Sequence, residues 1–148
     1  MRIVIACDHG GFPLKGFIKQ VVLSAGHDVL DVGTESLESV DYPDFAIKAG
    51  KAVQTEKAER GIILCGSGVG ACIAANKMKG IYASVCHDTY TAHQGVEHDN
   101  MNILCIGARV IGPELAREIV LSFLSADFLQ EERFQRRFKK VKAIEDAE

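Results

Sequence analysis

Five short apolar runs alternate with stretches of helical periodicity along the chain, and this alternation constrains the fold more than any other feature. Each run is rich in Val, Ile or Leu, which is typical of strands buried on both faces of a parallel sheet. Apolar stripes at helical spacing occupy residues 17–25 and 115–123, and Gly26 is expected to end the first of these helices. The expected strands are residues 3–7, 28–32, 61–65, 81–86 and 103–107.

This order of elements predicts an α/β fold. It is a three-layer α/β/α, doubly wound, Rossmann-like arrangement, with a five-stranded parallel sheet covered by helices on both faces. Residues 131–148 are expected to add a basic C-terminal helix. The chain of 148 residues has no evident linker, repeat or low-complexity tract, so residues 1–148 are expected to form a single domain.

Composition and charge exclude several functions. The net charge of −3 gives no basic field for nucleic acid. No apolar run approaches the roughly 20 residues that span a bilayer, and the N-terminus enters a strand-like run directly, so no membrane association and a cytoplasmic location are expected. Five cysteines in apolar settings, without a Cys-x-x-Cys pair, predict neither a disulfide framework nor a structural metal site.

A glycine-rich turn, Cys65-Gly66-Ser67-Gly68-Val69-Gly70, follows the third expected strand and precedes a helix. Such a turn leaves backbone N–H groups free to bind an anion, and a positive setting would lower the pKa of the Cys65 thiol and make it a base or nucleophile. Taken alone, the glycines fit tight strand–helix packing equally well.

Known phosphate-binding and phosphotransfer motifs do not match this turn. It lacks the Gly-Lys-Ser/Thr ending of a Walker loop and the first-strand position of a dinucleotide fingerprint. A Cys-x5-Arg phosphatase would need arginine where Ala71 stands, and a response regulator would need aspartate in place of Cys65.

Further polar residues lie after the first and fifth expected strands, just before the fifth strand and on the C-terminal helix, and ligands of open α/β sheets bind beyond the strand ends. Each alone could be a solvated loop or helix residue; together they predict a site for a small phosphorylated molecule. Arginines would bind the phosphate, and the glycine-rich turn would bind a developing negative charge. A thiol and a histidine would transfer protons in a reaction whose intermediate is an enediolate. These residues are Asp8, His9, His98, Asp99, Arg109, Arg133 and Arg137.

Over nearly its whole length the sequence resembles the ribose-5-phosphate isomerase B family. The most specific part of the resemblance is the Cys-Gly-Ser-Gly-x-Gly turn of residues 65–70 followed by Ile-Ala-Ala-Asn-Lys at 73–77. Supporting segments are residues 7–12, 14–15, 31–34, 39–44, 61–64, 98, 102–104 and 107–112.

The resemblance implies interconversion of ribose 5-phosphate and ribulose 5-phosphate, a step of the pentose phosphate pathway, without metal or organic cofactor. It implies that Cys65 is the base, that His98 opens the sugar ring, and that the members act as homodimers, some paired into tetramers, with sites shared between subunits. The substrate-binding residues that it implies are Asp8 for sugar hydroxyls, Tyr42 beside the site, Gly66, Ser67, Gly68, Val69 and Gly70 for the oxyanion, and His9, Arg109, Arg133 and Arg137 for phosphate.

Three departures from the family pattern leave the identity of the sugar phosphate undecided. Asp99 stands where the family usually has asparagine, and a carboxylate can only accept hydrogen bonds. Glu131-Glu132 precede Arg133, where they would oppose an anion or pair with the arginine, and residues 89–95 differ from the usual helix. Isomerisation of allose 6-phosphate or galactose 6-phosphate is therefore an alternative, followed by a non-catalytic sugar-phosphate sensor and a thiol hydrolase.

Overall fold

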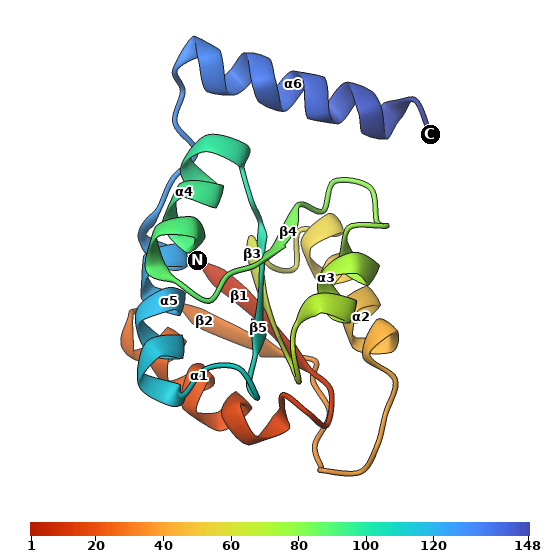
Figure 1. Ribbon diagram of the computed structural model, residues 1–148, viewed down its shortest axis with the longest axis vertical. Helices are drawn as coiled ribbons and strands as arrows, with labels where there is room; N and C mark the ends of the chain where they lie inside the picture. The colour runs from red at the N-terminus through yellow and green to blue at the C-terminus, as the bar shows by residue number, and fades with distance from the viewer.

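The structure is a computed structural model of residues 1–148, and its centre is one five-stranded, all-parallel sheet of order β2-β1-β3-β5-β4 (Figure 1). The strands are β1 (Arg2–Cys7), β2 (Asp28–Asp31), β3 (Arg60–Cys65), β4 (Ala83–Val85) and β5 (Ile103–Gly107). The helices are α1 (Phe12–Ser24), α2 (Tyr42–Gln54), α3 (Val69–Ala75), α4 (Thr89–Asp99), α5 (Pro113–Ser125) and α6 (Glu132–Asp146). This arrangement confirms the predicted doubly wound fold with an added C-terminal helix.

Two apolar cores lie on the two faces of the sheet. Helices α1, α4 and α5 cover one face around the fully buried Phe123, and α2 and α3 cover the other around Phe45 (Figure 1). The central strands β1, β3 and β5 are almost wholly buried, as their continuous apolar runs predict, whereas the edge strands β2 and β4 are only partly covered.

Of the predicted element boundaries, the end of the first helix is confirmed and the start of the fourth strand is wrong. Gly26 has φ +88° and its N–H donates to the Leu23 carbonyl, which confirms it as the C′ glycine after Ala25, the C-cap of α1. The predicted strand at 81–86 is too long, because Ile81 donates to the Met78 carbonyl in a turn and the Tyr82 N–H donates to the Asn102 side chain. Strand β4 therefore begins only at Ala83.

Helix α6 stands apart from the layered body, beside the edge of the sheet where the strands begin (Figure 1). It is held there by edge-on packing of Phe138 against Tyr82, with ring centroids 5.0 Å apart, and by Glu145, which accepts hydrogen bonds from Tyr82 and Gly80. A groove of about 790 Å³ lies between α6 and residues 76–82. None of the helices is both long enough and apolar enough to cross a bilayer.

Candidate functional site

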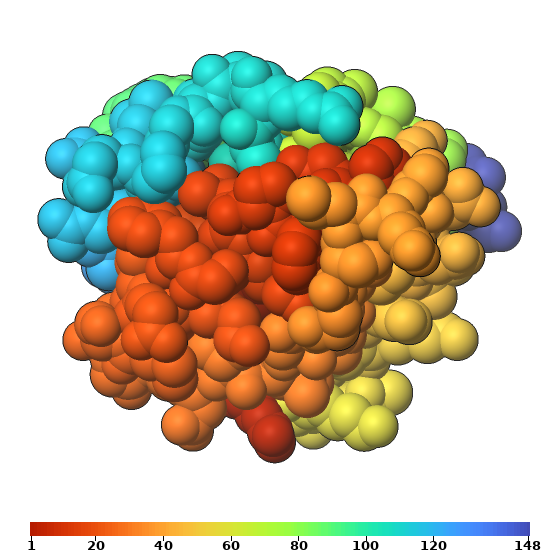
Figure 2. Space-filling view, turned by 90° about the horizontal axis from the view of Figure 1, so that it is seen from below, coloured from red at the N-terminus to blue at the C-terminus, as the bar shows by residue number.

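Three sequence-predicted residues meet at the edge where the strands end, the carboxyl edge of the sheet. Asp8 follows β1, Cys65 ends β3 and Arg109 follows β5, and the parallel register sets these positions side by side. The Cys65 thiol donates to Oδ2 of Asp8 at 3.3 Å, and Oδ1 of Asp8 accepts from the Gly11 N–H at 3.0 Å. Figure 2 looks onto this edge, where the residues after β1 (red), before α2 (orange) and after β5 (cyan) lie against one another.

The thiol of Cys65 is held in its protonated form. Burial first, and then the Asp8 carboxylate, raise its pKa to about 12, because a thiolate beside Asp8 would be a second negative charge. Backbone N–H groups of Gly66 and Ala71 act in the opposite direction but are outweighed. The expectation of a lowered thiol pKa is therefore wrong for this structure, because burial of the thiol and the neighbouring Asp8 carboxylate outweigh the donors of the turn.

The glycine-rich turn is shaped as an anion cradle. Gly68 adopts φ +83°, a left-handed conformation that favours glycine. The N–H groups of Ser67 and Gly68 donate no hydrogen bond within the chain, and that of Val69 donates to the Ser67 hydroxyl oxygen at 3.2 Å. The free N–H groups can bind a negatively charged oxygen, as the sequence predicts.

Two larger side chains border this cradle. The Tyr42 ring lies so close to Gly70 that a Cβ there would be 2.6 Å from the ring, and the Arg109 guanidinium would lie 3.1 Å from a Cβ on Gly66. The glycines thus let an aromatic wall and a cation approach the backbone directly. Arg109 is exposed, so its guanidinium can meet an anion that enters from solvent.

His9 lies beside the cradle with its ring oriented by the loop between β2 and α2. Its Nδ1 accepts a hydrogen bond from the Val40 N–H at 3.2 Å, so the proton of the neutral ring is on Nε2. A ring in that tautomer can donate to a phosphate oxygen, the role that the resemblance implies for His9.

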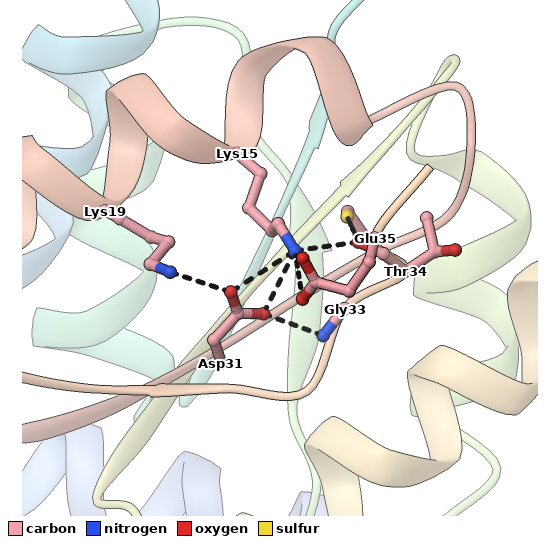
Figure 3. A network of polar contacts seen from close by, with 7 residues as sticks. Lys15, Lys19, Asp31, Gly33, Thr34 and Glu35 are labelled. Atoms are coloured by element: carbon pink, nitrogen blue, oxygen red, sulfur yellow. Dashed lines mark hydrogen bonds and ion pairs between the residues drawn. The ribbon is translucent and has the colours of Figure 1, made fainter. Parts of the chain in front are cut away.

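The loop that carries Val40 is tied to α1 by a buried ammonium group (Figure 3). Lys15, only 4% exposed, donates to the Thr34 carbonyl at 2.7 Å and to Glu35 at 2.8 Å, and it also pairs with Asp31. Lys19 pairs with the same Asp31 carboxylate at 2.9 Å. The sequence showed Lys15 only as part of the family motif. Its buried contacts could not be foreseen, because the crossover from β1 to β2 brings its partners close to it.

A second group of sequence-predicted residues lies at the opposite, amino edge of the sheet. Helix α4 begins after β4 and ends before β5, so its last turn, with His98 and Asp99, is separated from Cys65 by most of the length of an 11-residue helix, about 16 Å. Within one chain, Cys65 and His98 are therefore too far apart to contact the same small ligand.

Aromatic stacking organises this second group. The His98 ring stacks on the buried Phe134 of α6, with centroids 4.2 Å apart and planes inclined by 15°, and the Arg133 guanidinium lies 4.6 Å from the same Phe134 ring. Arg133 also pairs with Glu131 at 3.1 Å, whereas Glu132 pairs with Arg136. Arg137, one turn along α6, is exposed.

The sequence-predicted residues thus form two clusters. The carboxyl-edge cluster holds Asp8, His9, Tyr42, Cys65, the turn Gly66 to Gly70 and Arg109; the amino-edge cluster holds His98, Asp99, Arg133 and Arg137. Sequence reasoning missed Gln94 and Phe134, both of which contact His98. The four-residue spacing from Gln94 to His98 could have revealed the first, since such residues face each other on a helix.

Comparison with known proteins places the chain among sugar-phosphate isomerases. The family model described as Ribose/Galactose Isomerase matches residues 3–141. The chain belongs to this family. It is 42% identical over 144 residues to ribose-5-phosphate isomerase B of Escherichia coli, covering 97% of this chain and 96% of that one.

Other members of the family share its fold and differ in the sugar that they are named for. The structure of Clostridium thermocellum ribose-5-phosphate isomerase B superposes with a TM-score of 0.95, at 46% identity over 99% of both chains. D-Erythrulose-4-phosphate isomerase of Pectobacterium atrosepticum is 42% identical over 129 residues, covering 86% of this chain and 85% of that one.

Proposed function

We propose that the chain is an isomerase that interconverts ribose 5-phosphate and ribulose 5-phosphate through an enediolate. The observation that carries this proposal is the contact of the Cys65 thiol with Asp8 beside a turn whose Ser67 and Gly68 N–H groups are free. A proton acceptor and an oxyanion site side by side are what proton abstraction next to a carbonyl requires. The family membership supports the same reaction.

The chemical step begins with the proton on Cys65. It passes to Oδ2 of Asp8, its hydrogen-bond partner, and the thiolate then takes the proton from C2 of the open-chain aldose. The turn's N–H groups stabilise the enediolate oxygen, and the Ser67 hydroxyl still has a proton to donate. Return of the carbon-bound proton from the Cys65 thiol to C1, with a proton shift from O2 to O1, gives the ketose, and Asp8 returns its proton to the Cys65 thiolate. Hydrogen moves within one molecule, so no external oxidant or reductant is consumed.

The complete site needs a second copy of the chain. His98, Asp99, Arg133 and Arg137 would come from the partner, His98 to open the sugar ring and the arginines to bind phosphate. Exposed apolar residues support such an assembly: Val69 and Ile73 on α3 are 52% and 58% exposed, and Val141 and Ile144 on α6 are 47% and 69% exposed. These surfaces would be covered in a homodimer in which α6 reaches over its neighbour.

The test is turnover of a panel of sugar phosphates by the wild-type chain and by Cys65→Ala. Ribose 5-phosphate should be the best substrate among ribose 5-phosphate, allose 6-phosphate, galactose 6-phosphate and D-erythrose 4-phosphate. Cys65→Ala should abolish turnover while retaining ribose 5-phosphate binding, measured by calorimetry, and Cys86→Ala is the matched control outside the site. Normal turnover by Cys65→Ala would refute the base assignment. Binding without turnover by the wild type would indicate a sensor instead.

A further inference from the structure

Gln94 makes two hydrogen bonds that the proposed reaction does not yet use. Its side-chain nitrogen lies 3.1 Å from Nδ1 of His98 and 3.3 Å from Oδ2 of Asp99, one turn further along α4. A primary amide nitrogen carries two protons, so one proton is available for each partner.

The Asp99 carboxylate decides which end of the amide faces His98. If the amide were turned over, its oxygen would face a carboxylate oxygen at the same distance, and two acceptors would repel each other. The amide nitrogen must therefore face Asp99, and the same nitrogen faces His98. In this way the carboxylate orients the amide, and the amide then acts on the imidazole.

The amide in turn determines where the proton of His98 lies. An N–H that donates to Nδ1 requires a lone pair on that atom, so the neutral imidazole carries its proton on Nε2. Stacking on Phe134 at 4.2 Å fixes the plane of the ring. Nε2 has no hydrogen-bond partner within the chain, so its proton is available to a ligand.

We propose that Gln94, oriented by Asp99, is a positioning residue that fixes His98 as the Nε2–H tautomer for ring opening. The proposal rests on the ring-opening role of His98 proposed above. The Nε2 proton goes to the ring oxygen as its bond to C1 breaks. The proton of the C1 hydroxyl goes to Nε2 as the C1 carbonyl forms, so the imidazole ends neutral. With the proton on Nδ1 instead, His98 could not begin this exchange as a donor.

The tautomer can be read directly by NMR of the ¹⁵N-labelled protein at about pH 8.5, where imidazoles are neutral. Long-range ¹H–¹⁵N correlations should show a protonated Nε2 for His98 in the wild type. Gln94→Leu should give a mixture of tautomers, and Gln94→Glu should move the proton to Nδ1, because a carboxylate accepts from it. His98→Asn assigns the resonance. Gln135→Leu is the matched control, since Gln135 is a part-buried glutamine of α6 whose side chain bonds only to Gln130.

Kinetics then test whether the tautomer matters for ring opening. Gln94→Leu and Gln94→Glu should lower kcat for ribose 5-phosphate by about 10-fold with little change in KM, as expected for loss of a correctly protonated acid. Gln135→Leu should leave both unchanged. A wild-type Nε2–H signal that persists in Gln94→Leu would overturn the proposal, and so would a shifted tautomer with unchanged kcat. If His98→Asn itself retains kcat, the ring-opening assignment fails instead, whatever the tautomer.

Discussion

At the scale of single residues, the pairing of Cys65 with Asp8 predicts opposite effects of one substitution. In Asp8→Asn the carboxylate charge that raises the pKa of the Cys65 thiol is removed, so this pKa should fall and alkylation of Cys65 should speed up by about 10-fold per unit of pKa. Turnover should drop by about 100-fold, because the acceptor of the thiol proton is lost. Iodoacetamide labelling followed by mass spectrometry, with steady-state kinetics, measures both. If labelling and turnover fall together, Asp8 does not act through the thiol.

A second residue-scale prediction concerns Cys72, which lies on α3 just beyond the turn. A hydrogen bond with Cys105 lowers the pKa of Cys72 to about 7, further helped by Val85 and Asn76. The pKa values of Cys65 and Cys7 are raised to about 12 and about 11, both by burial first. At pH 7.5 iodoacetamide should therefore modify Cys72 before the other four thiols, as peptide mapping would show. Cys72→Ser should abolish this fast phase, and a fast phase that persists in that variant would contradict the prediction.

At the scale of elements, the loop between β2 and α2 depends on the buried ammonium of Lys15. Lys15→Met leaves the Thr34 carbonyl with only the weak Cys7 thiol donor at 3.7 Å and leaves Asp31 without its inner partner, so the free energy of unfolding should fall by about 3 kcal/mol. Lys19→Met is the control, because Lys19 contacts Asp31 but not the loop and its side chain is 35% exposed; it should cost below about 1 kcal/mol. Urea denaturation measures both, and equal losses would show that the loop contacts contribute nothing.

The same network predicts how this stability depends on pH. Burial raises the pKa of Asp31, but hydrogen bonds from Lys19, Gly33 and Lys15 outweigh it, so the folded pKa lies below 3.8. The contribution of the Asp31 carboxylate to stability is present above pH 3.8 and is lost as pH falls through the lowered folded pKa. Burial lowers the pKa of Lys15, but Glu35 and Asp31 raise it above 10.5, so its contribution is lost as pH rises through the raised value. The difference in the free energy of unfolding between wild type and Lys15→Met should be constant from about pH 5 to 9 and should shrink at more acidic and more basic pH, as urea titrations at each pH would show. A difference that increases above pH 11 would contradict this prediction.

The elements also show what sequence patterns can and cannot predict. Continuous apolar runs predicted the central strands because strands buried on both faces have no alternation of polar and apolar residues. Gly26 predicted a helix end because glycine tolerates the positive φ that this position adopts. The Lys15 network and the raised thiol pKa of Cys65 depend on distances between residues more than 15 positions apart in the chain. Such contacts depend on which strands become neighbours and on the path of the crossovers between them, which the residues of one strand or helix alone do not determine.

At the scale of the whole molecule, the direction of α4 divides the chemistry between the two edges of the sheet. A helix that connects two parallel strands must run from the carboxyl edge back to the amino edge, so residues of its last turn lie far from the strand ends. His98 precedes β5 closely in sequence, yet it lies on the amino edge for this reason. Reading the strand ends alone could predict which residues surround Cys65, but the position of His98 on the opposite edge follows only from the path of the connections.

This division predicts that two inactive variants restore activity when combined. In a homodimer whose sites each take Cys65 from one chain and His98 from the other, a mixed dimer of Cys65→Ala and His98→Asn has one site with both changes and one with neither. After unfolding and refolding together at equal amounts, half the dimers are mixed, so about one quarter of all sites should be intact. Turnover of ribose 5-phosphate should therefore recover to about one quarter of the wild-type value, whereas each variant refolded alone stays inactive. A double variant carrying both changes, refolded with wild type, controls for refolding yield. If the mixture is no more active than its components, each chain must hold its own complete site, and the pairing of opposite sheet edges across two chains is wrong.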